Sequence, residues 1–588
     1  MSENLYPNDG QYRQEIRDGM RIDWDVPIQM EDGAVLRCDI YRPIEAGKYP
    51  AILTHGPYAK WKHFDDLFPH AYSKLVSEHP DVAVGTSEKY QVWECVDPEK
   101  WVPEGYACVR VDSRGAGRSP GMLDLWSMRE TSDLKNCIEW AGGQHWCNGK
   151  IGLSGISYYA MNQWQVASLE PKHLAAICIW EGAADFYRDQ VYQGGILCNG
   201  LADALAPIQI YSVQHGKGTK GPRSRLTGDW VAGPIALSEE ELGANRRNYA
   251  ADVRRAKFAN DDYWTQRRPD WSKVKVPVLS AGNLGGTSLH LRGNVEGFVN
   301  AASKDKWLDL HGFEHWTTFY TDYGVNMQKK FFGHFLRGED TGWLNEPKIR
   351  IQVRHPGGRF VERHEKEWPL ARTKWTKYHL HPDFTMSLAP QTKAGKTSYK
   401  GFSDGVTFLT PPLEPTMEIT GPAAAKLWVS SATEDADLFL VFRAFSPDMK
   451  EVLFQGSNDP HTPLGNGWLR VSRRKLDPKL SLPYRPYHAH DESQPMKPGE
   501  IYEVDVEIWP LCITLPKGYR MALTVRGKDY EYAGDPVPFP PYKPWQGVAL
   551  FTHDDPGDRP AHIFSGDVTL HAGPDRQAHI LLPVIPTK

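Results

Sequence analysis

The sequence lacks the features that mark several large classes of protein. It contains no apolar run as long as a membrane span. Its net charge of −5 is small for 588 residues and is not the charge balance of a nucleic-acid-binding protein. It has no Walker loop, no dinucleotide-binding fingerprint and no metal-ligand spacing. We therefore expect neither a membrane nor nucleic acid as a partner, and no cofactor.

Cysteine is scarce as well, and its spacing excludes a second group of proteins. The eight cysteines are scattered along the chain without a C-x-x-C pair. We therefore do not expect a disulfide framework or a zinc site. We expect free, buried thiols in a reducing compartment. The N-terminus, Met1–Pro7, is polar and has no apolar core of a signal peptide. Together these observations predict a cytoplasmic protein.

The chain is too long for one hydrophobic core, and its patterns change along its length. Residues 1–186 and 273–345 alternate strand and helix signals, which predicts a mostly parallel sheet covered on both faces. Residues 187–272 are polar and partly helical, so we expect a helical cap inserted into that domain. Residues 348–588 contain many short strand patterns between turns, as a jelly roll does. The expected fold is therefore an α/β domain with a cap, followed by an all-β domain.

The most informative motif is the pentapeptide Gly155–Tyr159, which reads Gly-Ile-Ser-Tyr-Tyr. The short apolar run Lys150–Ser154 before it indicates a strand, and Ala160–Ala167 after it indicates a helix. A serine at the apex of a tight turn between a strand and a helix has the context of a nucleophile elbow. Gly-x-Ser alone is common in loops, so the flanking elements carry the interpretation. They predict that Ser157 is a nucleophile.

A serine nucleophile needs a base, and His315 has the expected position. It follows the last predicted strand of the α/β domain, Lys306–His311. In α/β-hydrolases the catalytic groups follow the chain order serine, acid, histidine. His311 lies inside the strand pattern itself and is a weaker candidate.

An oxyanion hole needs hydrogen-bond donors beside the nucleophile. The backbone N–H of Tyr158, the residue after the serine, is one candidate. The hydroxyl of Tyr58, which follows the strand pattern Tyr49–Thr54 and the segment His55–Pro57, is the second.

These motifs resemble those of the cocaine-esterase and X-Pro dipeptidyl-peptidase family of serine hydrolases. The resemblance extends over nearly the whole chain and rests on Gly56–Tyr58, Asp112–Gly121, Gly155–Ala160, Gln163–Gln165, Asp185–Arg188, His315, Pro498–Val504 and Pro516–Arg520. It implies an α/β-hydrolase domain with a helical cap and a jelly roll. It also implies an oxyanion hole made by the Tyr58 hydroxyl and the Tyr158 N–H.

The sequence departs from this family at two positions. Ala160 stands where the family usually has glycine, which is a mild change. Gly285 stands where the family has its catalytic Asp, and no carboxylate occurs between Gly282 and Glu296. An active enzyme therefore needs a substitute for that acid.

Three residues are candidates for the substitute. Glu181 follows a strand pattern at the edge of the sheet where active sites form, and it is the first choice. Glu314 is adjacent to His315 in the chain, but adjacent side chains seldom point at each other. Asn283 could orient a neutral imidazole by a hydrogen bond without compensating its charge.

The leading hypothesis is a serine hydrolase that cleaves an ester or amide of a small molecule through an acyl-enzyme on Ser157. An esterase is favoured over an X-Pro-type aminopeptidase, because no carboxylate for a substrate N-terminus is identifiable. An acyltransferase or lactone-forming enzyme would keep the same nucleophile. The alternative from another functional class is a non-catalytic binding protein with a decayed triad. The sequence also leaves open whether the protein forms a homodimer.

Overall fold

The computed structural model describes residues 6 and 11–586. Apart from Tyr6, the segment Met1–Pro7, on which the prediction about a signal peptide rests, lies outside the described residues. Within the described part, no helix combines the length and the apolar character that crossing a membrane requires. All eight cysteines are free and buried, as the sequence predicted.

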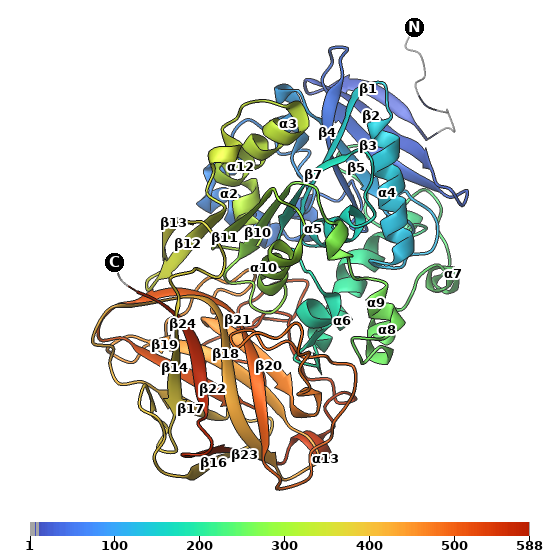
Figure 1. Cartoon of the computed structure of the whole chain (residues 1–588). Coiled ribbons are helices and arrows are strands. Elements are labelled where there is room, and N and C mark those ends of the chain that lie inside the picture. The colour runs from blue at the N-terminus through green and yellow to red at the C-terminus, as the bar shows by residue number, and fades with distance from the viewer. Residues whose placement is uncertain (1–5, 7–10, 587–588) are drawn as a thin grey trace.

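The first half of the chain builds one large sheet with a parallel centre (Figure 1). In spatial order its strands are β1 (Arg13–Arg17), β2 (Met20–Gln29), β3 (Val35–Arg42), β5 (Ala107–Asp112), β4 (Tyr49–Gly56), β6 (Cys147–Ile156), β7 (Leu174–Trp180), β10 (Val278–Asn283), β11 (Lys306–His311), β12 (Ile349–His355) and β13 (Arg359–Glu365). Neighbours from β5 to β12 are parallel, and the remaining pairs are antiparallel. The central strands are buried apolar runs because helices cover a parallel sheet.

The carboxyl ends of the parallel strands meet at one edge of this sheet. β4, β6, β7, β10 and β11 end there at Gly56, Ile156, Trp180, Asn283 and His311. The loops after these strands therefore lie close together, although they are far apart in the sequence.

Helices cover the sheet and join its strands (Figure 1). They are α1 (Phe64–Leu67), α2 (Pro69–Glu78), α3 (Pro98–Trp101), α4 (Met128–Gly142), α5 (Tyr158–Ala167), α10 (Leu291–Asn300), α11 (Thr317–Tyr320) and α12 (Asp322–Phe332). The side chain of Ser127 accepts the N–H of Glu130 and so caps the start of α4. A Cβ on Gly152 of β6 would lie 2.6 Å from the Phe332 ring of α12, so the close contact between this strand and helix requires glycine.

Residues 187–272 leave the sheet after β7 and return to it at β10. They form α6 (Asn199–Ala204), α7 (Glu239–Ala244), α8 (Tyr249–Arg255), α9 (Asp262–Thr265) and a small antiparallel ribbon of β8 (Tyr192–Gln193) and β9 (Ile196–Leu197). α6, α8 and α9 lie close to the C-terminal domain (Figure 1), and the Arg254–Asp555 ion pair at 2.8 Å joins α8 to it.

The C-terminal domain is an antiparallel jelly roll with its own apolar core. Its strands are β14 (Lys374–Leu380), β15 (Met386–Ser387), β16 (Gly395–Lys400), β17 (Val406–Leu409), β18 (Met417–Ser431), β19 (Asp437–Phe445), β20 (Gly465–Arg470), β21 (Tyr502–Leu515), β22 (Arg520–Arg526), β23 (Asp567–Ala572) and β24 (His579–Ile585), with one short helix, α13 (Ala561–Phe564). The long strands β18 and β21 pair along most of their length.

The strands β12 and β13 lie within residues 348–588, which the sequence assigned to the jelly roll, but they pair mainly with the first sheet. β12 pairs in parallel with β11, with Ile349 opposite Leu308, and β13 pairs with β12. Both strands therefore extend the first sheet, although β12 also touches β21 through the pair Arg354–Ile513. Alternating apolar residues mark a strand but do not say which sheet it joins, so the sequence pattern could not place them.

Candidate active site

The turn after β6 holds Ser157 in a strained conformation. Its φ of 54° and ψ of −111° are unusual for a residue with a side chain, and α5 starts at the next residue. The Ser157 N–H donates to the carbonyl of Trp180 on the neighbouring strand at 3.0 Å. A Cβ on Gly155 would lie 2.5 Å from Cβ of Tyr159, so glycine is needed for the turn to close. The motif therefore forms a strained strand–turn–helix with serine at its apex.

Tyr58 follows β4 and lines the same pocket as Ser157. Its ring packs against those of Tyr158 and Tyr159, with centroids 5.7 Å apart in both cases. Burial raises the pKa of Tyr58 well above its usual value, so its hydroxyl remains a hydrogen-bond donor. The N–H of Tyr158 is the first of α5, where helix geometry provides no internal acceptor. The two predicted donors thus lie close to the turn that carries Ser157.

A buried charge cluster holds the loop that carries Tyr58. The ammonium of Lys60 lies 2.8 Å from Asp25 and 3.1 Å from Asp39. The backbone N–H of Lys60 donates to the carboxylate of Asp112 at 2.6 Å. The Asp112 motif therefore has a structural role here, which is to fix the loop after β4.

His315 lies on the loop after β11 and lines the same pocket as Ser157. Its backbone N–H donates to the carbonyl of Ser457, from the C-terminal domain, at 2.9 Å. In the described structure neither ring nitrogen has a hydrogen-bond partner of good geometry. Burial lowers the pKa of His315 well below its usual value, so the imidazole is neutral at physiological pH. The structure thus brings a strained serine and a neutral imidazole to one pocket.

The pocket is small, largely aromatic and built from all three parts of the chain. It encloses about 50 Å³. Besides the residues already described, its walls are Phe68, Trp93, Glu94, Leu201, Leu205, Gln209, Leu289, Trp316, Asn458, Phe539, Tyr542, Trp545, Leu550 and Phe551. Such a lining excludes water well and favours a small apolar group.

Glu94 is the carboxyl group that the structure places against His315. Its Oε1 is 3.2 Å from Nε2 of His315, and its Oε2 is buried without a hydrogen-bond partner. Burial, and then the nearby charge of Glu181, raise the pKa of Glu94 well above its usual value. The Glu94 carbonyl accepts the N–H of Ile156, which fixes the residue beside the nucleophile turn. Sequence reasoning missed Glu94, because no motif separates it from an ordinary loop glutamate.

The acid predicted for His315 has a different partner. Oε1 of Glu181 is 2.9 Å from Nε2 of His311, and Oε2 accepts the N–H of Asn283. The other nitrogen of His311, Nδ1, is 2.8 Å from Asp309. Burial opposes charge on His311, but the hydrogen bonds to Asp309 and Glu181 outweigh it and raise its pKa to about 9. Glu181 is therefore part of a closed buried ion network, and the expected contact with His315 is replaced by one with His311.

The other two candidates for the acid also have different partners. The amide of Asn283 donates to the carbonyl of Phe313, so it anchors the backbone of the histidine loop rather than the imidazole. The carboxylate of Glu314 binds Lys74 and accepts the hydroxyl of Thr317 at 2.9 Å.

The structure also explains why residue 285 is glycine. A Cβ at Gly285 would lie 2.4 Å from Cα of Gly456 in the C-terminal domain. The N–H of Ser457 in the same loop donates to the carbonyl of Gly285 at 3.2 Å. The jelly roll therefore occupies the space that an Asp side chain at 285 would need.

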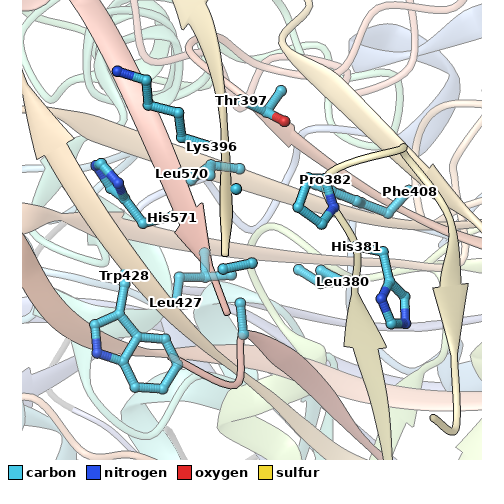
Figure 2. A pocket seen from close by; sticks show the side chains of 13 residues that line it. Leu380, His381, Pro382, Lys396, Thr397, Phe408, Leu427, Trp428, Leu570 and His571 are labelled. Atoms are coloured by element: carbon cyan, nitrogen blue, oxygen red, sulfur yellow. The ribbon is translucent and has the colours of Figure 1, made fainter. Parts of the chain in front are cut away.

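A second serine–histidine pair lies in the jelly roll. Ser430 Oγ is 2.8 Å from Nε2 of His571. Ser430 is part of the regular strand β18 and not of a strained turn. The hollow that His571 lines with Trp428 and Leu427 encloses only about 10 Å³ (Figure 2). The pair lacks the turn and the pocket that surround Ser157.

Comparisons with known proteins agree with the fold of both domains. Residues 32–317 match the family model of X-Pro dipeptidyl-peptidase (S15 family), and residues 341–552 match that of the X-Pro dipeptidyl-peptidase C-terminal non-catalytic domain. The chain is 23% identical to cocaine esterase of Rhodococcus sp., over 95% of this chain and 98% of that protein. It is 22% identical to Xaa-Pro dipeptidyl-peptidase of Streptococcus pneumoniae, over 47% of this chain and 40% of that protein. A solved CocE/NonD family hydrolase from Staphylococcus aureus is 27% identical, with a TM-score of 0.82 and coverage of 99% of this chain and 100% of that chain.

Proposed function

Both domains of the chain resemble the cocaine-esterase and X-Pro dipeptidyl-peptidase family of α/β-hydrolases, and from this premise we propose that it is a serine esterase. The proposed substrate is a carboxylic ester with a small apolar acyl group. The observation that carries the proposal is that Ser157 in its strained turn, the hydroxyl-bearing Tyr58 and the neutral His315 line one pocket.

The proposed reaction proceeds through an acyl-enzyme. His315 takes the proton of Ser157 Oγ as that oxygen bonds to the acyl carbon. The Tyr58 hydroxyl and the Tyr158 N–H donate to the oxyanion of the tetrahedral intermediate. The bond to the leaving oxygen then breaks, and His315 returns the proton to the alcohol. A water molecule, deprotonated by His315, attacks the acyl carbon, and the acid leaves with Ser157 and His315 restored.

A fluorophosphonate probe tests the nucleophile directly. We expect the wild-type chain to be labelled and Ser157→Ala to remain unlabelled. Ser430→Ala is the matched control, because Ser430 is the other serine bonded to a histidine, and it should label like wild type. A wild-type chain that is folded and unlabelled would contradict the proposal and favour a binding protein with a decayed site.

A panel of p-nitrophenyl esters of increasing chain length tests the acyl group. Because the pocket encloses about 50 Å³, we expect kcat/KM to fall steeply beyond the short acyl chains. Equal rates for short and long chains would contradict the proposed pocket. Addition of a competing alcohol distinguishes hydrolysis from acyl transfer, since a transferase would form the new ester instead of the acid.

One observation favours a second candidate, an X-Pro-type aminopeptidase. Glu94 places a carboxyl group in the pocket, and a bound substrate ammonium would favour its ionised form and pair with it. Xaa-Pro p-nitroanilides compared with p-nitrophenyl esters separate the two activities. Turnover of the anilides that Glu94→Gln abolishes would favour the peptidase.

We also propose that the protein acts in a reducing compartment such as the cytoplasm. Its eight cysteines are buried and free, so the fold does not depend on oxidation. Unchanged thermal stability in the presence of a thiol reductant is the expected result.

A further inference from the structure

A second histidine lies beside His315, on the loop that leads from β10 into α10. His290 immediately precedes α10, and its side chain is completely buried. Its Nδ1 is 3.1 Å from the carbonyl of Gly182. The ring centroids of His290 and His315 are 5.9 Å apart, and the rings meet nearly at right angles, at 85°.

The contact with Gly182 determines which nitrogen of His290 carries the proton. A carbonyl oxygen only accepts hydrogen bonds, so Nδ1 of His290 must be the donor. Burial lowers the pKa of His290 to about 3, so the ring is neutral at physiological pH. Its Nε2 therefore has a free lone pair, and in the described structure this buried atom has no hydrogen-bond partner.

His315 has the complementary vacancy. Its Nε2 is 3.2 Å from Oε1 of Glu94, another residue of the pocket. Its Nδ1 is buried without a hydrogen-bond partner in the described structure. A neutral imidazole whose Nε2 acts as a base must carry its proton on Nδ1, so this nitrogen is a donor in need of an acceptor. Leaving the His315 Nδ1–H and the His290 Nε2 unpaired in the interior would cost free energy.

We propose that His290 is the positioning residue that takes the place of the missing triad carboxylate. In this arrangement Nδ1–H of His315 donates to Nε2 of His290, and the lone pair of His315 Nε2, which has Glu94 Oε1 3.2 Å away, accepts the proton of Ser157. The inference rests on the proposed function, because it assigns His315 the role of base. Nδ1 of His315 and Nε2 of His290 do not form a hydrogen bond in the described structure, and catalytic hydrogen bonds often tighten only when substrate binds.

The surroundings explain why a histidine fits this role where an Asp does not. Gly456 blocks a side chain at Gly285, so the loop after β10 cannot supply the acid from that position. His290 lies further along the same loop, with its neutral ring against that of His315. A neutral acceptor orients the base but does not balance the charge of an imidazolium. Glu94 lies at the other nitrogen, but burial raises its pKa well above the usual value and favours its neutral form, so it does not supply this charge at rest either.

The test compares rates of fluorophosphonate labelling and of p-nitrophenyl acetate hydrolysis in three variants. We expect His290→Ala to lower kcat and the labelling rate by about 10²- to 10⁴-fold, because an unoriented base occupies the wrong tautomer, with little change in KM. His290→Gln should recover part of the loss, since its amide oxygen can accept the same hydrogen bond. Glu94→Gln is the comparison variant. Wild-type rates in folded His290→Ala, or a loss confined to Glu94→Gln, would overturn the assignment.

A second measurement is made on the wild-type protein and does not need a folded His290 variant. In wild-type protein with ¹⁵N-labelled histidines, the His315 signal, assigned with His315→Gln, should show Nδ1 protonated and Nε2 bare. His290 should show the same tautomer, because of Gly182. A His315 protonated on Nε2 overturns the inference. Failure of the proposed function itself is distinguishable, since wild type would then not be labelled at Ser157 at all.

Discussion

Two histidines on the same short stretch of chain have opposite surroundings. His311 ends β11 between two carboxylates, with Glu181 at 2.9 Å and Asp309 at 2.8 Å, and both of its nitrogens are satisfied. His315, on the loop that follows, has no hydrogen bond of good geometry on either nitrogen and faces a cavity. The pKa of His311 is raised to about 9, whereas that of His315 is lowered well below its usual value.

The comparison of His311 with His315 distinguishes a histidine that stabilises the fold from one that is available for a reaction. A histidine with both nitrogens bound to buried carboxylates is a cation that holds the fold together, and it has no lone pair to offer a substrate. A buried histidine with unpaired nitrogens costs stability, and such a cost is usually found where a reaction needs the group. The satisfied site is therefore expected to control stability, and the unsatisfied one to control activity.

The largest effect is expected from His315→Gln. Loss of the general base should lower kcat for p-nitrophenyl acetate by about 10⁴- to 10⁶-fold. The thermal midpoint should stay the same or rise, because an unpaired buried ring is removed. Steady-state kinetics with differential scanning calorimetry checks both. If His315→Gln were instead unstable, and its folded fraction hydrolysed the ester at the wild-type rate, His315 would be a structural residue and not the base.

The matched change at the other histidine, His311→Gln, should act on stability. It leaves Glu181 and Asp309 buried without their cation, which typically costs about 3–5 kcal/mol in the free energy of unfolding. Urea unfolding measures this loss, and the labelling of Ser157 in the remaining folded protein should persist. An unchanged unfolding midpoint would contradict the comparison.

Tyr58 and Tyr323 show the same contrast between a group available for a reaction and one held by structural hydrogen bonds. Removing the Tyr58 hydroxyl with Tyr58→Phe should lower kcat by about 10²- to 10³-fold, as the loss of one oxyanion donor does, and should leave stability intact. Tyr323 is the control, because its hydroxyl is bound to Asp309 and Glu362, both at 3.2 Å. Tyr323→Phe should keep full activity and lower stability slightly. Equal kinetics in Tyr58→Phe and wild type would remove Tyr58 from the oxyanion hole.

The smallest effect is the pH dependence of stability. His311 has a pKa of about 9 in the folded chain, against a usual value of 6.5. The folded state thus holds the proton more tightly, and this stabilisation is complete below about pH 6.5 and lost as the pH rises through about 9. The amount is on the order of 3 kcal/mol, and the raised pKa of Glu181 acts in the same direction. Urea unfolding of wild type should weaken over this range, and His311→Gln should lose much of that slope. Parallel slopes in the two proteins would assign the pH dependence to other groups.

Much of the site could be predicted because it depends on local patterns. Ser157 sits between a recognisable strand and helix, and Tyr58 and His315 follow recognisable strands at one sheet edge. Parallel strands bring their carboxyl ends together whatever the details of packing. Glu181 was also placed correctly at that edge, but its partner was not, because two histidines follow the same strand and the spacing does not say which one it meets.

Two other residues escaped prediction for a different reason. Glu94 lies between β4 and β5 without a motif, and only its contact with the nucleophile turn reveals it. His290 lies in the loop where the family resemblance predicts a carboxylate, and its proposed role depends on the tautomer that Gly182 imposes. Neither signal is present in a linear pattern.

The order of strands and helices and the turn at Ser157 follow from the sequence by itself, whereas the boundary near residue 348 does not, because β12 and β13 join the first sheet. Hydrophobic periodicity and glycine positions act locally and need no knowledge of distant contacts. The pairing of the buried charges was decided only by the tertiary structure. It depends on which segments exclude water from which side chains, and on the jelly-roll loop at Gly456 that leaves no room for a side chain at Gly285.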